Sequence, residues 1–119
     1  MSDSPDAAAL VACLCAAWCR TCDEYRSVFE TLRAEFGTRA KFVWVDIEDD
    51  EAVLGELDIE DFPTLALVRG EHIAFFGPVL PHLQTARQLI ERGLHGELPP
   101  VDEAPLAGLP ARLRTLSRA

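Results

Sequence analysis

Two cysteines three positions apart constrain this chain of 119 residues more than any other feature; they lie in the stretch Trp18-Cys19-Arg20-Thr21-Cys22. An apolar run from Leu10 to Ala17 precedes the pair, and a helical pattern follows it. If the run is a strand, Cys19 lies at a helix N-terminus, where the partial positive charge and the free N–H groups favour a thiolate. One helical turn then brings Cys22 beside Cys19. Such a pair, with one exposed and activated sulfur, is what thiol–disulfide exchange requires.

The composition narrows the class of protein. The length predicts one small domain, and about half of the residues are apolar, which is enough for a core. A net charge of −9 argues against binding to nucleic acid or to an anionic membrane. No basic region precedes the first apolar run and no run is long enough to span a bilayer, so we expect a cytoplasmic protein. Four cysteines in that compartment are more often catalytic or metal-binding than structural disulfides.

The first half of the chain reads as strand, helix, strand. The apolar run from Leu10 to Ala16 has the length of a strand buried on both faces. Apolar residues at steps of three and four then predict a helix from Cys19 to Phe36. Residues 41–47 are rich in β-branched and aromatic side chains and predict a second strand, parallel to the first across a helical crossover.

The second half predicts a hairpin and a last helix. Residues 65–68 and 72–76 are apolar runs joined by a turn at 69–71, and a helix follows from Pro81 to about Gly93. We therefore expect a short N-terminal segment at 1–9 with one helical turn, a domain at 10–96, and a Pro-containing tail at 97–119.

Two segments have two interpretations each. The stretch 46–61 carries acidic residues and no Lys or Arg; it is either the solvated face of a short helix within 48–60 or a docking surface for a basic partner. The tail contains four prolines, and its leucines have helical spacing with arginines between them. We expect it to be mostly flexible; the alternative is a short basic amphipathic piece that docks on the acidic body or on a partner.

The order of elements, together with these motifs, is similar to the thioredoxin family. The matching residues are Ala17 to Cys22, Asp46 at the end of the second strand, Phe62-Pro63-Thr64 before the hairpin, Gly70-Glu71 within it and Gly77 after it. The resemblance runs from Leu10 to Leu94 and implies an α/β fold in three layers, a mixed central sheet with helices on both faces. We expect the family's first strand and helix to be reduced or absent here. The strand at 41–47 would then lie at a sheet edge, where the N-terminal segment, the tail or a second molecule, forming a dimer, could cover it.

The resemblance also implies roles for individual residues. Cys19 would be the attacking thiolate and Cys22 the resolving thiol. Pro63 would be preceded by a cis bond that brings the Phe62 backbone beside the cysteines, where it pairs with an extended substrate segment. The residues expected to bind substrate are Trp18, Phe62, Pro63, Thr64 and Gly77, the last by leaving room for the peptide.

Four positions depart from the family pattern, and three of them, Arg20, Thr21 and Cys13, would tune the site. Arg20 and Thr21 replace Gly-Pro; the Arg20 charge would stabilise the Cys19 thiolate and make the disulfide more oxidising, unless its side chain points to solvent. Cys13 stands where the family often has a buried acid, and Trp44 where the lysine partner of that acid lies. Cys13 is either a small buried apolar residue, as is Cys15, or a third redox sulfur near Cys22.

The leading hypothesis is a thiol–disulfide oxidoreductase that acts on protein disulfides and is restored by a separate reductase or other electron donor. It needs no cofactor, nucleic acid or membrane. A binding or assembly module with the same fold and little turnover is the alternative. A zinc or iron–sulfur site built from Cys13, Cys15, Cys19 and Cys22 is disfavoured, because Cys13 and Cys15 would point into the core.

Overall fold

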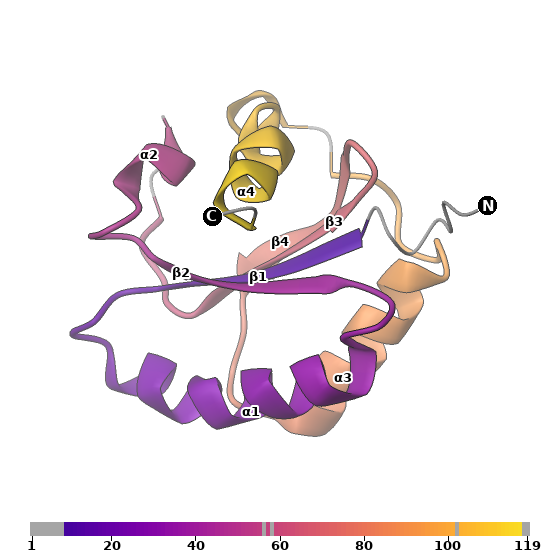
Figure 1. The fold of residues 1–119 in the computed structure, drawn as a ribbon, viewed down its shortest axis with the longest axis horizontal. Coiled ribbons are helices and arrows are strands. Elements are labelled where there is room, and N and C mark those ends of the chain that lie inside the picture. Colours follow the sequence, from indigo (N-terminus) through magenta and orange to yellow (C-terminus); the bar gives the residue numbers. More distant parts are fainter. Residues whose placement is uncertain (1–8, 56, 58, 102, 118–119) are drawn as a thin grey trace.

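The computed structural model describes residues 9–55, 57, 59–101 and 103–117, and it contains a four-stranded mixed sheet in the order β2-β1-β3-β4 (Figure 1). Strand β1 (Ala9–Cys15) is parallel to β2 (Lys41–Asp46) and antiparallel to β3 (Thr64–Arg69). Strand β4 (His72–Pro78) completes the hairpin with β3. The predicted mixed sheet, parallel crossover and hairpin are confirmed, whereas the helical turn expected near the N-terminus falls almost wholly outside the described residues.

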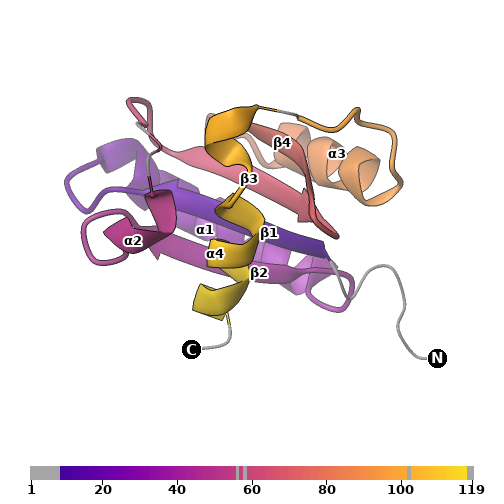
Figure 2. The ribbon, with the colours of Figure 1, turned by 90° about the horizontal axis from the view of Figure 1, so that it is seen from above.

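Helices cover both faces of the sheet, so the predicted three-layer fold is confirmed. Helices α1 (Arg20–Phe36) and α3 (Leu83–Leu94) lie on one face. The other face carries α2 (Glu51–Leu54), the short 3₁₀ turn Ala104–Leu106 and α4 (Leu109–Ser117), as Figure 2 shows from above. None of the helices in the described part of the chain is long and apolar enough to cross a membrane.

Strand β1 contributes residues to the hydrophobic core on both faces of the sheet. All seven of its residues are buried, and alternation along the strand sends Val11, Cys13 and Cys15 toward α1 and α3. Leu10 and Leu14 face α2 and α4 instead. A strand with helices on both sides has no solvated face, which explains why its sequence is a continuous apolar run rather than an alternating one.

The C-terminal segment, expected to be mostly flexible, contains helix α4, which packs on the sheet. Leu106, Leu109 and Leu113 are at most 4% exposed, and they pack on the apolar residues of β1, β2 and β3. The physical reason is that α2 is only four residues long and leaves this face of the sheet uncovered. Pro110 lies in the first turn of α4, where proline costs no helical hydrogen bond. The alternative of a basic amphipathic piece docked on the body describes this segment.

Arg112 fastens α4 to the end of α2. Its guanidinium donates hydrogen bonds to the carbonyl oxygens of Val53 (2.5 Å) and Leu54 (3.3 Å) at the C-terminus of this short helix, where carbonyl groups lack partners within the helix; the Leu54 carbonyl also accepts from the Leu57 N–H at 2.9 Å. Gly55 follows with φ of 58°, and a Cβ there would lie 2.9 Å from Arg112 Cζ. The glycine therefore provides both the left-handed turn and the space for the arginine.

The acidic segment forms less helix than predicted. Among the described residues of this segment, only Glu51–Leu54 is α-helical. The Asp46 carboxylate accepts hydrogen bonds from the backbone N–H groups of Glu48 (2.9 Å) and Asp49 (3.4 Å) before the helix, and Gly55, with a positive φ, follows it. The local turn at Asp46 replaces the first helical turn that the sequence suggested.

Candidate functional site

The two cysteines lie where the chain passes from β1 to α1. After Cys15, the chain turns through Ala16 to Trp18, and the Cys19 N–H donates to the Ala16 carbonyl oxygen at 3.0 Å. Cys19 is the N-cap residue of α1, in extended backbone conformation, and is half-buried, whereas Cys22 is only 2% exposed. The site therefore offers one accessible sulfur at a helix N-terminus, with a second sulfur buried one turn behind it.

The Phe62–Pro63 peptide bond is cis, as predicted, and it borders the cysteines. The Cys19 thiol donates to the Phe62 carbonyl oxygen at 3.7 Å, so residues 43 positions apart in the chain form one surface. The loop is held by two further hydrogen bonds. The Thr64 hydroxyl donates to the Asp61 carbonyl at 2.6 Å, and the Val79 N–H donates to the Pro63 carbonyl at 3.0 Å.

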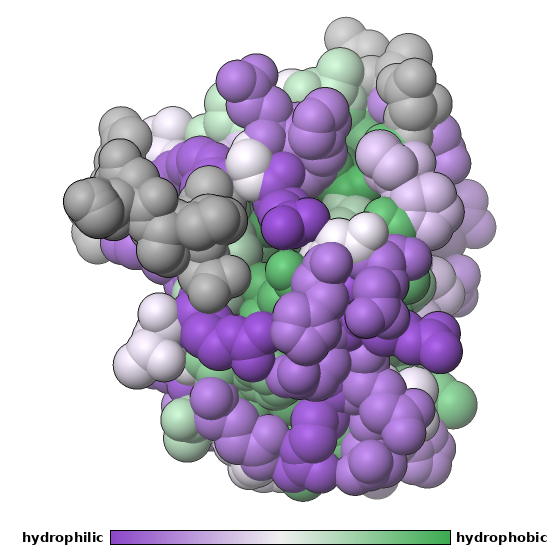
Figure 3. Space-filling model, turned by 90° about the vertical axis from the view of Figure 1, so that its right-hand side faces the viewer, coloured by the Kyte–Doolittle hydropathy of each residue, from purple (hydrophilic) through white to green (hydrophobic). Residues whose placement is uncertain are grey.

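Exposed apolar side chains lie near the cis-proline loop that borders Cys19. Trp18 is 68% exposed and meets Phe62 edge-on, with ring centroids 5.7 Å apart. Leu80, 65% exposed, follows Val79, whose N–H is bonded to the Pro63 carbonyl. An apolar groove of about 650 Å³ lies between the end of β4 and α3; its lining residues include Phe75, Pro78, Val79, Leu80, Ala86 and Leu89. The opposite end of the molecule, at the β3–β4 turn, is mainly hydrophilic (Figure 3).

Cys22 contacts Cys15 rather than Cys13. Burial first, and then a hydrogen bond with Cys15, raise the pKa of Cys22 above its usual range, while a backbone hydrogen bond from Ala16 acts in the opposite direction. Cys13 lies deeper, with its Sγ 3.5 Å from the Cys15 Sγ. The sulfur beside Cys22 is therefore that of Cys15 and not, as the sequence had suggested, that of Cys13. The signal was present in the sequence, because alternation along β1 puts both cysteines on the face toward α1.

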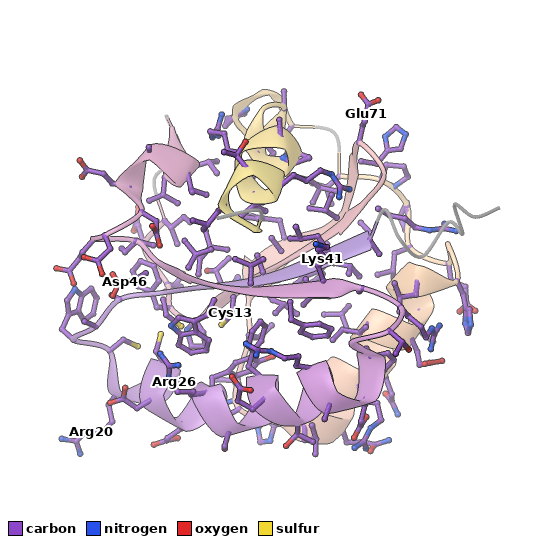
Figure 4. The ribbon with its side chains drawn as sticks, in the orientation of Figure 1. Cys13, Arg20, Arg26, Lys41, Asp46 and Glu71 are labelled. Carbon is purple, nitrogen blue, oxygen red and sulfur yellow. The ribbon has the colours of Figure 1, made fainter. Side chains whose placement is uncertain are left out.

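The other residues singled out in the sequence lie farther from the sulfur atoms or make no contact that tests their predicted roles. Arg20 is exposed and points away from the sulfur atoms, which matches the solvent-facing alternative (Figure 4). Trp44 packs against Phe29 of α1, with ring centroids 5.6 Å apart, and the Arg26 guanidinium lies 4.4 Å above its ring. Gly77 pairs with Leu65 in the sheet, next to the Pro78–Thr64 pair. Its role in leaving room for a peptide stays a prediction, as do the role of Thr21 in tuning the site and the role of Thr64 in binding substrate.

The site does not resemble a metal centre. Among the residues that the structure describes, no group of three or more His, Cys, Asp or Glu side chains is arranged to hold a metal ion. All four cysteines are free thiols.

Comparison with known proteins decides the family. The family model for thioredoxin matches residues 3–78. The chain belongs to the thioredoxin family. It is 31% identical over 72 residues to the thioredoxin of Haemophilus influenzae, covering 60% of this chain and 67% of that protein. It is therefore a protein thiol–disulfide oxidoreductase, a class that acts on protein disulfides and relies on reductase partners.

Solved thioredoxin structures share the fold. Thioredoxin-2 of the malaria parasite, a component of its protein secretion machinery, superposes with a TM-score of 0.65 at 19% identity, covering 71% of this chain and 82% of that chain. A mutant thioredoxin from Halobacterium salinarum gives 0.63 at 25% identity, covering 73% and 75% respectively. The thioredoxin family model ends at residue 78, so α4 lies beyond the residues that it matches.

Proposed function

We propose that Cys19 is the nucleophile and Cys22 the resolving thiol of this oxidoreductase. The observation that carries the proposal is the position of Cys19: half-exposed at the N-terminus of α1, hydrogen-bonded to the Phe62 carbonyl and backed by the buried Cys22. Helix N-termini stabilise thiolates, and only the thiolate attacks a disulfide.

The reaction runs through a mixed disulfide. The Cys19 thiolate attacks one sulfur of a substrate disulfide, and the electron pair of the broken bond leaves with the other substrate sulfur. Cys22 then loses its proton and attacks the Cys19 sulfur, which forms the Cys19–Cys22 disulfide and releases the second substrate thiol. A separate reductase returns two electrons to the pair. Because the pKa of Cys22 is raised, this second step accelerates as the pH rises above neutral.

The surroundings support substrates with an extended, apolar segment next to their cysteine. Trp18 and Phe62 provide an aromatic wall, Pro63 and Gly77 border the strand end, and the groove beside Leu80 accepts apolar side chains. A substrate strand would pair with the Phe62 backbone and turn its alternate side chains toward this groove.

Reduction of insulin disulfides with dithiothreitol as electron donor tests the proposal. Cys19→Ser should abolish the reaction, and Ser27→Ala, exposed on the same helix, serves as the matched control. Cys22→Ser should accumulate a covalent adduct through Cys19. Equal activity of the wild type and Cys19→Ser would contradict the assignment, and only non-covalent binding by Cys22→Ser would favour the binding module instead.

We also propose a dimer through the edge of β2, in a cytoplasmic setting. Within the described chain β2 pairs only with β1, and a hollow of about 460 Å³ runs along its outer side past Lys41 to Trp44. Unpaired edges of this kind are templates for a second strand. Sedimentation velocity over a range of concentrations should show self-association that Val43→Lys weakens; a monomer at every concentration would contradict it.

A further inference from the structure

The dithiol is the outer part of a row of four sulfurs. The Cys13 and Cys15 sulfur atoms are hydrogen-bonded at 3.5 Å. Cys22 interacts with Cys15 and with Cys19, and both interactions help to raise its pKa, whereas Cys15 interacts directly with Cys22 and only at longer range with Cys19. All four belong to the core cluster beneath α1, and Cys19 alone among them is half-exposed. Figure 4 shows sulfur atoms gathered between the strand and the start of α1, near the label of Cys13. The dithiol mechanism uses only the outer two.

Cys22 therefore shares the buried cluster with a further thiol, Cys15, with which it interacts. In the oxidised protein, the Cys22 sulfur would have the Cys19 sulfur on one side and the Cys15 sulfur on the other. Thiol–disulfide exchange needs a third sulfur next to the disulfide, on the side away from the leaving sulfur. We propose that Cys15 exchanges into the oxidised dithiol, forming a buried Cys15–Cys22 disulfide and releasing Cys19 as a free thiol. This rests on the Cys19–Cys22 mechanism proposed above.

The step balances without an external oxidant or reductant. The Cys15 thiol gives up its proton and its sulfur attacks the Cys22 sulfur; the Cys19–Cys22 bond breaks, and the electron pair and a proton end on Cys19. One disulfide and one thiol are present before and after. The product presents a single reactive sulfur at the surface, with its resolving partner occupied. In this form the protein would hold a substrate as a mixed disulfide instead of releasing it.

The environment makes this exchange slower than ordinary turnover. The hydrogen bond with Cys13, and then burial, raise the pKa of Cys15 well above its usual range, so little thiolate is present at neutral pH. Tyr25 is fully buried beside these cysteines, and its hydroxyl has no hydrogen-bond partner within the described structure. That hydroxyl is a donor available to the charge that develops on the attacking sulfur. Because the exchange is slow, the buried disulfide would form only when the oxidised protein waits for its reductase.

A native labelling experiment tests the exchange. The wild type is oxidised with one equivalent of 2,2′-dipyridyl disulfide, which forms the Cys19–Cys22 disulfide, and is incubated with N-ethylmaleimide at pH 8.5. The Cys19 released by exchange is captured by the maleimide. Peptic digestion in acid, which prevents further exchange, and mass spectrometry should find labelled Cys19 together with a Cys15–Cys22 disulfide.

Two truncations on the same strand serve as matched variants with opposite expected effects. Cys15→Ala should lose the labelling of Cys19, because no sulfur can attack Cys22. Cys13→Ala should speed it, because the hydrogen bond that most raises the pKa of Cys15 is removed. Loss of packing alone would change both variants in the same direction. No labelling of the oxidised wild type, or equal labelling in wild type and Cys15→Ala, would overturn the exchange. Insulin reduction measured in parallel separates the two proposals: activity without labelling refutes only the exchange, and its absence refutes the dithiol mechanism.

Discussion

Truncating Leu113 to alanine tests whether α4 is part of the domain. Leu113 is completely buried, in one cluster with Leu10, Leu14 and Val68 of the sheet. Leu→Ala at such sites costs about 2–5 kcal/mol, from lost burial and the cavity left behind. A domain has only about 5–15 kcal/mol of net stability, so the change is a large fraction of the total.

Equilibrium unfolding of the reduced protein in urea, followed by circular dichroism, measures this loss. With a denaturant slope of about 2 kcal/mol per molar for a small protein, the midpoint should fall by roughly 1–2.5 M. Thr115→Ala is the matched control, since Thr115 is exposed two residues away and its hydroxyl donates a hydrogen bond to the Ala111 carbonyl within the same helix. Its effect should stay within about 0.5 kcal/mol.

The refuting result is a Leu113→Ala midpoint equal to that of Thr115→Ala. It would mean that α4 does not pack on the sheet in solution and that residues 97–119 form the flexible tail expected from the sequence. Leu109→Ala, also completely buried, provides an independent check and should cost a comparable amount.

Three further predictions concern the cysteines, the α2–α4 contact and the groove. The pKa values of Cys15 and Cys22 are raised in the folded state, so the unfolded protein loses these two protons at a lower pH than the folded protein does. The two thiols therefore contribute fully to the free energy of unfolding below the pKa of an unfolded thiol, and this contribution is lost as the pH rises above that value. The reduced protein should lose about 1.4 kcal/mol of unfolding free energy per pH unit for each of the two thiols above about pH 8.5, and equal urea midpoints at pH 8 and pH 10 would contradict this. Arg112→Ala should lower the unfolding free energy by roughly 1–3 kcal/mol through its lost hydrogen bonds to the end of α2; a urea midpoint like that of the wild type would show the contact to be unimportant. Leu80→Asp should raise the KM for insulin while the rate with a small aromatic disulfide stays unchanged, and a parallel fall in both rates would argue against a substrate groove.

Local patterns accounted for most of the elements and for the dithiol. The steps of three and four after Cys19 correspond to α1, and the continuous run before it corresponds to β1. The cis bond before Pro63 was also predicted, from its motif before the hairpin. Two segments were predicted less well. In the acidic stretch, a turn at Asp46 takes the place of the predicted first helical turn. In the last segment, the prolines favoured a flexible tail in the prediction, although the leucine spacing indicated the helix that is present.

The spacing of Cys19 and Cys22 by itself determined that the two sulfurs lie within one helical turn, because a helix places residues three apart on the same side. Alternation likewise determined that Cys13 and Cys15 share a face of β1. Only the tertiary structure decided which of them contacts Cys22, because that depends on how α1 lies over the strand. It also decided that α4 covers the sheet, because the length of α2 determines how much apolar surface is left exposed. Short-range periodicity carries the first kind of information, and the docking of elements distant in the chain carries the second.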